Sequence, residues 1–213
     1  MPIPAPDRFT MSLGEAIYSM RAIRRFRPKE IEERDLRDIL DAARQAPNGG
    51  NAQPWRFLLV TDVEKRARLG ELYREAWWTK RKDEGINGPE DIPAGKGVRQ
   101  SAMRLADEIG EAPALVLVCS NSRGEGAAQS VIPSVQNLLL AARAIGVGGT
   151  ITTLHSIVEE RVHQLFDIPA EARVVYCVPL GYPRGRFGPV NRKPLSEVAA
   201  VNSWTNTPDW MAT

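Results

Sequence analysis

Residues 46–57, APNGGNAQPWRF, constrain the fold most, because they interrupt a helical pattern with a specific polar loop. Before them, apolar residues at helical spacing predict an amphipathic helix over 31–43. After them, the apolar run 57–60 predicts a short strand. The segment is therefore predicted to be a helix-to-strand loop. Pro47 ends the helix, because proline disfavours helical geometry in the residue before it.

The residues of this loop also suit a planar ligand. Gly49 and Gly50 allow positive φ angles and a close approach of the backbone to a ligand. Asn48, Asn51 and Gln53 carry amides that both donate and accept hydrogen bonds, as a flat heterocycle with alternating donors and acceptors requires. An ordinary helix stop uses the same residue types, so the residues alone leave both interpretations open.

Two basic stretches, far apart in the sequence, are candidates for binding a phosphate. Residues 21–27 hold four arginines, among them Arg21 and Arg24. Residues 184–195 form a second basic loop after a strand predicted over 173–180. Guanidinium groups bind phosphate oxygens bidentately, and two separated clusters suit one bound phosphate. A solvated helix end and a solvated loop are the alternatives.

The helix before the first basic stretch is predicted to begin at Ser12, because Ser12 and Glu15 have the spacing of a capping box. Its inward face is expected to carry four apolar residues: Leu13, Ala16, Ile17 and Met20.

The middle of the chain predicts a sheet with helices around it. The continuous apolar run 114–119 predicts a strand that is buried on both faces. Residues 131–145 predict a broadly apolar helix with Pro133 in its first turn, where a missing donor is tolerated. The glycines at 146–149 follow a helix and lead to a strand, an order that disfavours a separate dinucleotide-binding fold. The order of elements predicts an α+β domain.

Two tryptophans, Trp77 and Trp78, lie on a helix predicted to begin at the N-cap Asp62. One interpretation is that the two tryptophans form an aromatic edge of the core, and that the aliphatic parts of the neighbouring lysine and arginine side chains lie over it. The alternative is a lid over 77–97 that closes on a ligand, because 83–97 has little pattern and is typical of a mobile loop.

His155 is a candidate proton donor, because the ordinary pKa of histidine suits acid–base chemistry. It immediately precedes Ser156, which with Glu159 is predicted to form a capping box that opens a helix over 157–166. His163 lies among charged neighbours in that helix and is predicted to be on the surface.

The overall composition excludes several classes of protein. The 28 Lys and Arg residues nearly balance the 26 Asp and Glu residues, so nothing favours nucleic acid as a partner. No apolar run approaches the roughly 18 residues that a membrane-spanning helix requires, and the start of the chain lacks the apolar region of a signal peptide. We expect a cytoplasmic protein, with Cys119 and Cys177 as buried thiols and no metal site.

Three motifs, in the same order, resemble those of the nitroreductase family. The loop 46–57 is close to the family form APSGGNxQPWRF, with Asn48 at the usual serine. Residues 20–26 resemble the family's FMN motif RRSVRRF, with Met20 and Ala22 in place of its first arginine and its serine.

The third motif lies near the end of the chain. A strand that ends in GYP, followed by a loop ending in RKPL, resembles the family's closing GYP and RRKPL. In that family the arginine before Lys-Pro-Leu, here Arg192, contacts the FMN phosphate.

The resemblance implies a nitroreductase-like α+β fold with a mixed, mainly antiparallel central sheet, in a homodimer with two FMN sites at the interface. The resemblance covers residues 12–198, the FMN domain. Residues 1–11 are rich in proline and are expected to form an extended arm, and residues 199–213 are expected to form a tail that packs on the partner subunit. The implied FMN-binding residues are Arg21, Ala22, Arg24, Pro47, Asn48, Gly49, Asn51, Gln53, Thr152, Thr153, Arg192 and Lys193. Substrate or lid residues would be Trp77, Trp78 and His155.

The activity that this resemblance implies is transfer of hydride or electrons from NADH or NADPH to a nitroaromatic, a quinone or another small conjugated acceptor. With no second nucleotide fold, both substrates are expected to stack in turn on one face of FMN, which gives ping-pong kinetics. No catalytic side chain is required, because the flavin carries the chemistry. Alternatives are a related flavoenzyme, such as a reductive dehalogenase or a substrate dehydrogenase, a flavin-binding protein without turnover, and a paralogue that has lost FMN.

Overall fold

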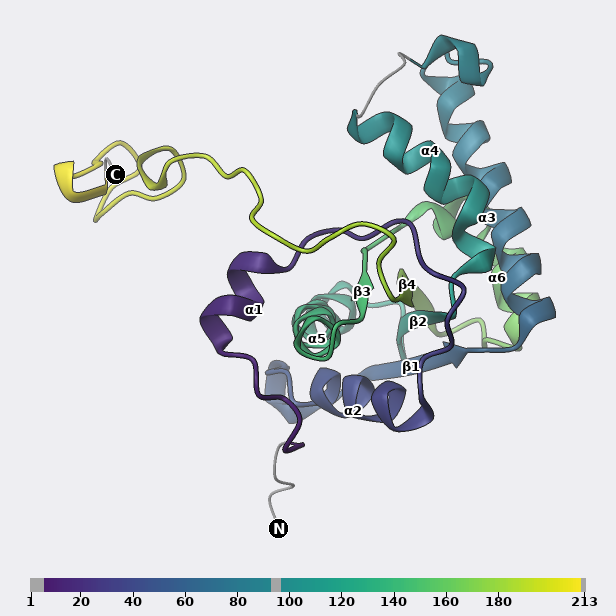
Figure 1. Cartoon of the computed structure of the whole chain (residues 1–213), viewed down its shortest axis with the longest axis horizontal. Helices are drawn as coiled ribbons and strands as arrows, with labels where there is room; N and C mark the ends of the chain where they lie inside the picture. Colours follow the sequence, from purple (N-terminus) through teal and green to yellow (C-terminus); the bar gives the residue numbers. More distant parts are fainter. Residues whose placement is uncertain (1–5, 93–96, 212–213) are drawn as a thin grey trace.

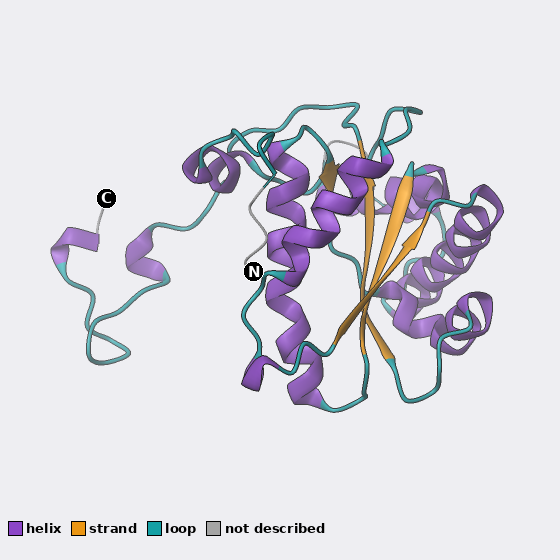
Figure 2. Ribbon diagram, turned by 90° about the horizontal axis from the view of Figure 1, so that it is seen from below, coloured by secondary structure: helices purple, strands orange, loops and turns teal. Residues whose placement is uncertain are grey.

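A computed structural model describes residues 6–92 and 97–211 of the chain. Its centre is a four-stranded sheet in the order β1-β2-β4-β3 (Figures 1 and 2). Within the described residues every strand pairing is antiparallel. The strands are β1 (Trp55–Val60), β2 (Ala114–Ser120), β3 (Gly148–Gly149) and β4 (Arg173–Gly181). The prediction of an α+β fold with a mainly antiparallel sheet is confirmed.

Helices cover both faces of this sheet (Figure 2). One face packs on α2 (Glu33–Arg44) and α5 (Glu125–Ala144), and the other on α3 (Val63–Asp83), α4 (Val98–Glu108) and α6 (Glu159–Phe166). The central strand β2 is buried throughout, because its side chains alternate between the two cores. Leu115 and Leu117 point to the α3 side, whereas Val116 and Val118 point to the α2 and α5 side.

The first helix, α1 (Leu13–Ser19), begins as predicted but does not present the predicted face. The Ser12 hydroxyl accepts a hydrogen bond from the Glu15 amide at 3.1 Å. Leu13 and Ile17, which were expected to be inward, are 69% and 45% exposed, and Ala16 is buried. The predicted inward face of α1 was therefore wrong within the single chain. The helix contacts the rest of the domain mainly through α5.

Helix α5 begins at Glu125, six residues before the predicted start, so Pro133 lies inside the helix rather than in its first turn. An internal proline removes one backbone hydrogen bond and weakens a helix. Here the flanking turns are fixed by packing, since Ala128 and Val131 before the proline and Val135 after it are buried. Tertiary contacts therefore override the local signal.

The helix predicted over 157–166 begins at Glu159, not at Ile157. The Ser156 hydroxyl donates to the Thr153 carbonyl at 2.8 Å, so Ser156 stabilises a 3-10 turn over Leu154–Val158 instead of capping the helix. His163 is 9% exposed and not on the surface, because its helix turns it toward the core.

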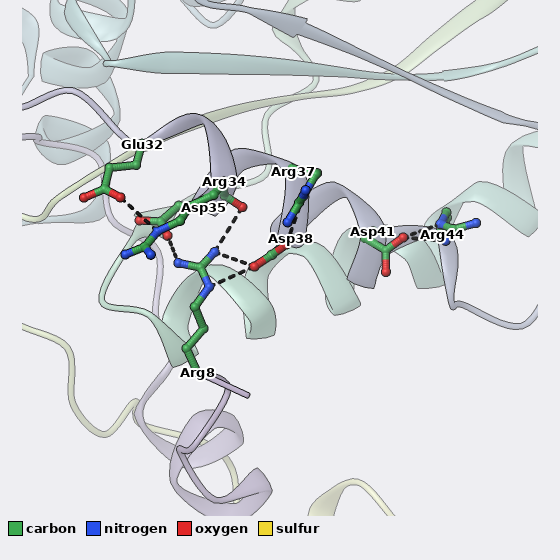
Figure 3. Close-up of polar contacts among 8 residues, drawn as sticks. All are labelled: Arg8, Glu32, Arg34, Asp35, Arg37, Asp38, Asp41 and Arg44. Carbon is green, nitrogen blue, oxygen red and sulfur yellow. Dashed lines mark hydrogen bonds and ion pairs between the residues drawn. The ribbon is translucent and has the colours of Figure 1, made fainter. Parts of the chain in front are cut away.

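Arg8 fastens the N-terminal segment to α2 (Figure 3). Its guanidinium pairs with Asp35 and donates from Nε to Asp38 Oδ2 at 2.8 Å. The hydrogen bond from Arg8 holds the pKa of Asp38 below its ordinary value. Residues 6–11 are thus held on the helix, while residues 1–5 of the predicted arm lie outside the described residues.

The C-terminal segment leaves the body of the molecule and extends beside it (Figures 1 and 2). Trp204 and Trp210 in this segment are 96% and 66% exposed. Among residues 6–92 and 97–211, no helix is long and apolar enough to cross a membrane.

Candidate functional site

The loop between α2 and β1 has an uncommon backbone. Gly50 has a φ of +59°, as the sequence predicted for the glycine pair, but Asn51 and Gln53 also have positive φ values, +51° and +48°. Residues other than glycine rarely adopt this conformation, and asparagine tolerates it better than most. Two such residues within three positions indicate a loop held in one shape by its surroundings.

Hydrogen bonds within and around the loop hold that shape. The Asn48 Oδ1 atom accepts from the Gln53 amide at 2.7 Å, and the Gly49 amide donates to the Ser130 hydroxyl of α5 at 3.3 Å. Asn48 therefore uses its side-chain oxygen inside the loop. The side chains of Asn51 and Gln53 are exposed and have no hydrogen-bond partner among the described residues. These two amides are the ones available to a ligand.

A pocket of about 400 Å³ lies at the N-terminal basic stretch. It gathers arginines from residues 21–25 and 184–186, and the Ser101 side chain from the first turns of α4. The lining residues are Arg21, Ala22, Ile23, Arg24, Arg25, Ser101, Arg184, Gly185 and Arg186.

Backbone pairing between two distant segments builds this pocket. Phe26 and Pro183 form an antiparallel bridge, and the Arg184 amide donates to the Arg25 carbonyl at 3.1 Å. The segments approach closely because Gly181 has no side chain. A Cβ atom there would lie 2.8 Å from the Phe26 ring and 2.7 Å from Pro113.

The two basic stretches are thus brought together, as the sequence suggested, but through different residues. Arg184 and Arg186 line the pocket, whereas Arg192 and Lys193 do not. Arg192 donates to the Asn191 carbonyl at 3.1 Å, and Lys193 lies 3.4 Å from Glu197. Arg184 and Arg186 belong to the predicted second basic loop, but sequence reasoning did not single them out, because their position depends on the bridge at Pro183. The predicted phosphate contacts of Arg192 and Lys193 stay a prediction.

Thr152 and Thr153, the predicted contacts to the flavin ring, differ in what they offer. The Thr152 amide donates to the Cys177 carbonyl at 3.0 Å, and its hydroxyl donates to the same oxygen at 2.8 Å. The Thr153 amide has no partner in the described part of the chain and is exposed. Burial raises the pKa of the neighbouring Tyr73 phenol to about 12, while the Thr152 hydroxyl and the Arg24 guanidinium oppose that rise.

Trp77 is a core residue, 5% exposed, with the Arg81 guanidinium 4.5 Å from its ring centroid. Trp78 is half-buried against the same core. The core-edge interpretation accounts for Trp77, and Trp78 remains the candidate for a lid. Residues 93–96 of the predicted lid over 77–97 lie outside the described residues.

His155 is 1% exposed, and its Nε2 lies 2.9 Å from the Val174 carbonyl of β4. Because a carbonyl only accepts, Nε2 carries the proton and donates. Burial lowers the pKa of His155, so the ring is neutral near pH 7. In this arrangement the imidazole is fixed inside the core and faces no solvent.

The amide loop and the arginine pocket lie at opposite ends of the sheet. The loop leads into Trp55, which pairs with Ser120 at one end of β2. The pocket segment follows Gly181, beside Ala114 and Pro113 at the other end. The strand β2, which runs between these two ends, is about 20 Å long at roughly 3.4 Å per residue.

The residues present fit a flavin nucleotide in two respects. The pocket is lined by five arginines and no carboxylate, which suits a phosphate group. The free amides of Asn51 and Gln53 suit the polar edge of a heterocycle. Within the described ranges, no group of three or more His, Cys, Asp or Glu side chains is placed to hold a metal ion.

Comparison with known proteins identifies the family to which this chain belongs. The model of the nitroreductase family matches residues 17–182, and the chain belongs to this family. An NADH dehydrogenase from Thermus thermophilus is 29% identical over 195 residues, covering 86% of this chain and 92% of that protein. An iodotyrosine deiodinase from Thermotoga neapolitana is 31% identical over 163 residues, covering 76% and 84%.

A solved structure of oxidized iodotyrosine deiodinase, bound to FMN and 3-iodo-L-tyrosine, resembles this chain with a TM-score of 0.74 and 26% sequence identity. The match covers 91% of this chain and 100% of that one. The expectation of a nitroreductase-family fold is therefore confirmed, while its relatives carry out more than one reaction.

Proposed function

We propose that this protein is an FMN-dependent oxidoreductase that passes hydride or electrons from NADH or NADPH to a small conjugated acceptor, such as a nitroaromatic or a quinone. The observation that carries the proposal is the strained loop, in which Asn51 and Gln53 present unpaired amides from positive-φ positions. FMN, when bound, would supply reversible hydride and electron chemistry at its ring system.

The residues of this chain would bind FMN and orient its ring. Asn51 and Gln53 would fix the polar edge of the ring, and the free Thr153 amide would donate to it. Arg21 and Arg24 would hold the phosphate. Donors fixed before the reaction stabilise negative charge on the ring without rearrangement, so no side chain needs to act as an acid or base.

The proposal includes a homodimer whose two sites lie at the subunit interface. Within one chain the loop and the pocket lie at opposite ends of β2, a strand about 20 Å long. A two-fold axis can place the loop of one copy beside the pocket of the other. The exposed side chains of Leu13 and Ile17 on α1 supply an apolar surface that a second copy would cover.

The C-terminal tail is proposed to lie on the partner subunit. Its Trp204 and Trp210 are large apolar side chains that make few contacts within their own chain. A groove of about 430 Å³ between the N-terminal segment, α1, α2 and α5 is lined mainly by apolar residues, among them Phe9, Met11 and Leu140. Such a groove and such a tail are complementary features of a subunit interface.

The test is to purify the protein, record its absorbance spectrum and identify any flavin released on denaturation. The account predicts a yellow protein that releases FMN and oxidises NADH or NADPH when a quinone or nitroaromatic is supplied. Initial rates at several fixed acceptor concentrations should give parallel double-reciprocal lines. A colourless protein that cannot be reconstituted with FMN would contradict the proposal, and intersecting lines would contradict the shared site.

Reductive dehalogenation is a second candidate, because an iodotyrosine deiodinase is 31% identical to this chain. The chemically reduced protein should be offered 3-iodo-L-tyrosine and a quinone in parallel. Faster reoxidation by the iodinated substrate, with release of iodide, would favour the second candidate over the first.

A further inference from the structure

Arg143, in the last turn of α5, is a charged side chain that lies almost entirely inside the molecule. Its side chain is 12% exposed. Its Nε atom donates to the Ser19 hydroxyl at 2.8 Å, and its Nη2 atom lies 3.5 Å from the Glu15 carboxylate. Its Cζ atom lies 4.3 Å from the centre of the Phe187 ring. One guanidinium group therefore contacts both the end of α1 and the loop that follows β4.

The two elements that Arg143 contacts lead into the segments that build the arginine pocket. These segments run side by side in opposite directions (Figure 1). Near the sheet, the Arg184 amide donates to the Arg25 carbonyl at 3.1 Å. At the far end, the Gly188 amide donates to the Ser19 carbonyl at 3.0 Å, and within the described ranges this is the one backbone hydrogen bond that joins residues 19–24 to residues 185–190. Backbone pairing alone therefore holds the far end weakly.

Arg143 supplies the side-chain contacts at this far end. A planar guanidinium can stack on an aromatic ring and donate hydrogen bonds at the same time, which a lysine ammonium does less well. Ser19 lies two positions before Arg21, and Phe187 comes directly after Arg186. A shift of either contact would therefore move an arginine of the pocket. Arg143 itself does not line the pocket.

We propose that Arg143 is a positioning residue, which fixes the places of Arg21 and Arg186 at the pocket without touching the bound ligand. The proposal rests on the proposed function, in which this pocket receives the phosphate end of FMN. Loss of the Arg143 guanidinium would leave the pocket arginines on the chain but no longer hold their two segments at one separation.

The first measurement is the affinity of flavin-free protein for FMN and for riboflavin, which lacks the phosphate, by quenching of flavin fluorescence. Arg143→Met keeps an apolar stem and removes the guanidinium. It should weaken FMN binding about tenfold and riboflavin binding by less than about twofold, because misplaced arginines weaken only the charge-assisted contacts to phosphate. Arg44→Met is the matched control, since Arg44 also lies in the last turn of its helix, α2, but does not line the pocket. The control should change neither affinity.

The contact between Arg143 and Phe187 is tested by Phe187→Leu and by the double variant. If Arg143 acts through Phe187, then Phe187→Leu should also weaken FMN binding selectively, and the double variant should bind FMN about as weakly as Arg143→Met alone. Arg143→Lys should recover part of the FMN affinity that Arg143→Met loses. Phe187→Leu and Arg143→Lys also carry the comparison with riboflavin if Arg143→Met does not fold. Purely additive losses would overturn the proposal.

Amide hydrogen exchange, measured by NMR, separates this inference from the proposed function. If the wild-type protein binds no flavin, the proposed function fails, but the positioning by Arg143 is still tested in the free protein. The Gly188 amide should exchange about tenfold faster in Arg143→Met than in the wild type, while the Arg184 amide should keep its rate. Equal acceleration at both amides, or an unchanged rate at Gly188, would overturn the inference. An equal loss of FMN and riboflavin binding, or no loss of either, would also overturn it.

Discussion

Arg184 donates a hydrogen bond of 2.7 Å to the backbone carbonyl of Phe26, 158 positions earlier in the chain. This contact joins the two ends of the folded domain at the arginine pocket. The pocket therefore depends on a contact between segments that are distant in sequence, since Pro183 follows β4 and Phe26 follows α1.

Replacing Gly181 by alanine should loosen the pocket. The new Cβ would lie 2.7 Å from Pro113 Cδ and 2.8 Å from the Phe26 ring, and neither group is flexible. We expect the free energy of unfolding to fall by about 1–3 kcal/mol, as for other overpacked sites. Gly185→Ala is the control, because a Cβ there meets nothing within 4 Å. Chemical denaturation compares the two, and equal stabilities would show that Gly181 is not a close-contact position.

Asn51→Gly should separate the backbone role of Asn51 from its amide. Glycine accepts the φ of +51° without strain, so stability should stay within about 1 kcal/mol of the wild type, whereas Asn51→Ala should lose about 1–2 kcal/mol. Both variants lack the amide, so both should shift the absorbance spectrum and the reduction potential of bound flavin. An unchanged spectrum in both would remove Asn51 from the flavin site.

Much of the fold follows from local patterns in the sequence. The helical spacing before Ala46 and the apolar run after Trp55 place the loop, and the unbroken apolar run at Ala114 predicts the central strand. These signals are strong because burial on one or both faces dictates the residue types directly.

Other features of the fold and the site depend on contacts between residues that are far apart in the sequence, and local patterns do not reveal them. Pro133 predicts a helix start, yet packing on both sides of it extends α5 by six residues. The glycine pair predicts positive φ, yet Asn51 and Gln53 adopt it as well. The position of Arg184 and Arg186 at the pocket depends on how Pro183 pairs with Phe26, and no motif in either segment encodes that pairing.

His155 should make the protein less stable in mild acid. Its folded-state pKa is depressed by burial, so below the ordinary value of about 6.5 the unfolded chain takes up a proton that the folded chain does not. Stability is therefore full above pH 7 and falls toward pH 5, by at most about 1.4 kcal/mol per pH unit from this group.

His155→Gln keeps a donor for the Val174 carbonyl and removes the titration, so its melting temperature should depend less on pH over this range. His163→Gln is the control. Equal pH dependence in the wild type and His155→Gln would contradict the role assigned to burial of the imidazole.

Complementation between two defective variants tests most directly whether each site takes its loop from one copy and its arginine pocket from the other. The variants are Asn51→Gly with Gln53→Gly, and Arg21→Glu with Arg24→Glu. Each should bind FMN poorly alone. After a 1:1 mixture exchanges subunits, half of the dimers combine one of each, and about one quarter of all sites should regain FMN binding. No recovery, with both variants folded and dimeric, would contradict the shared site.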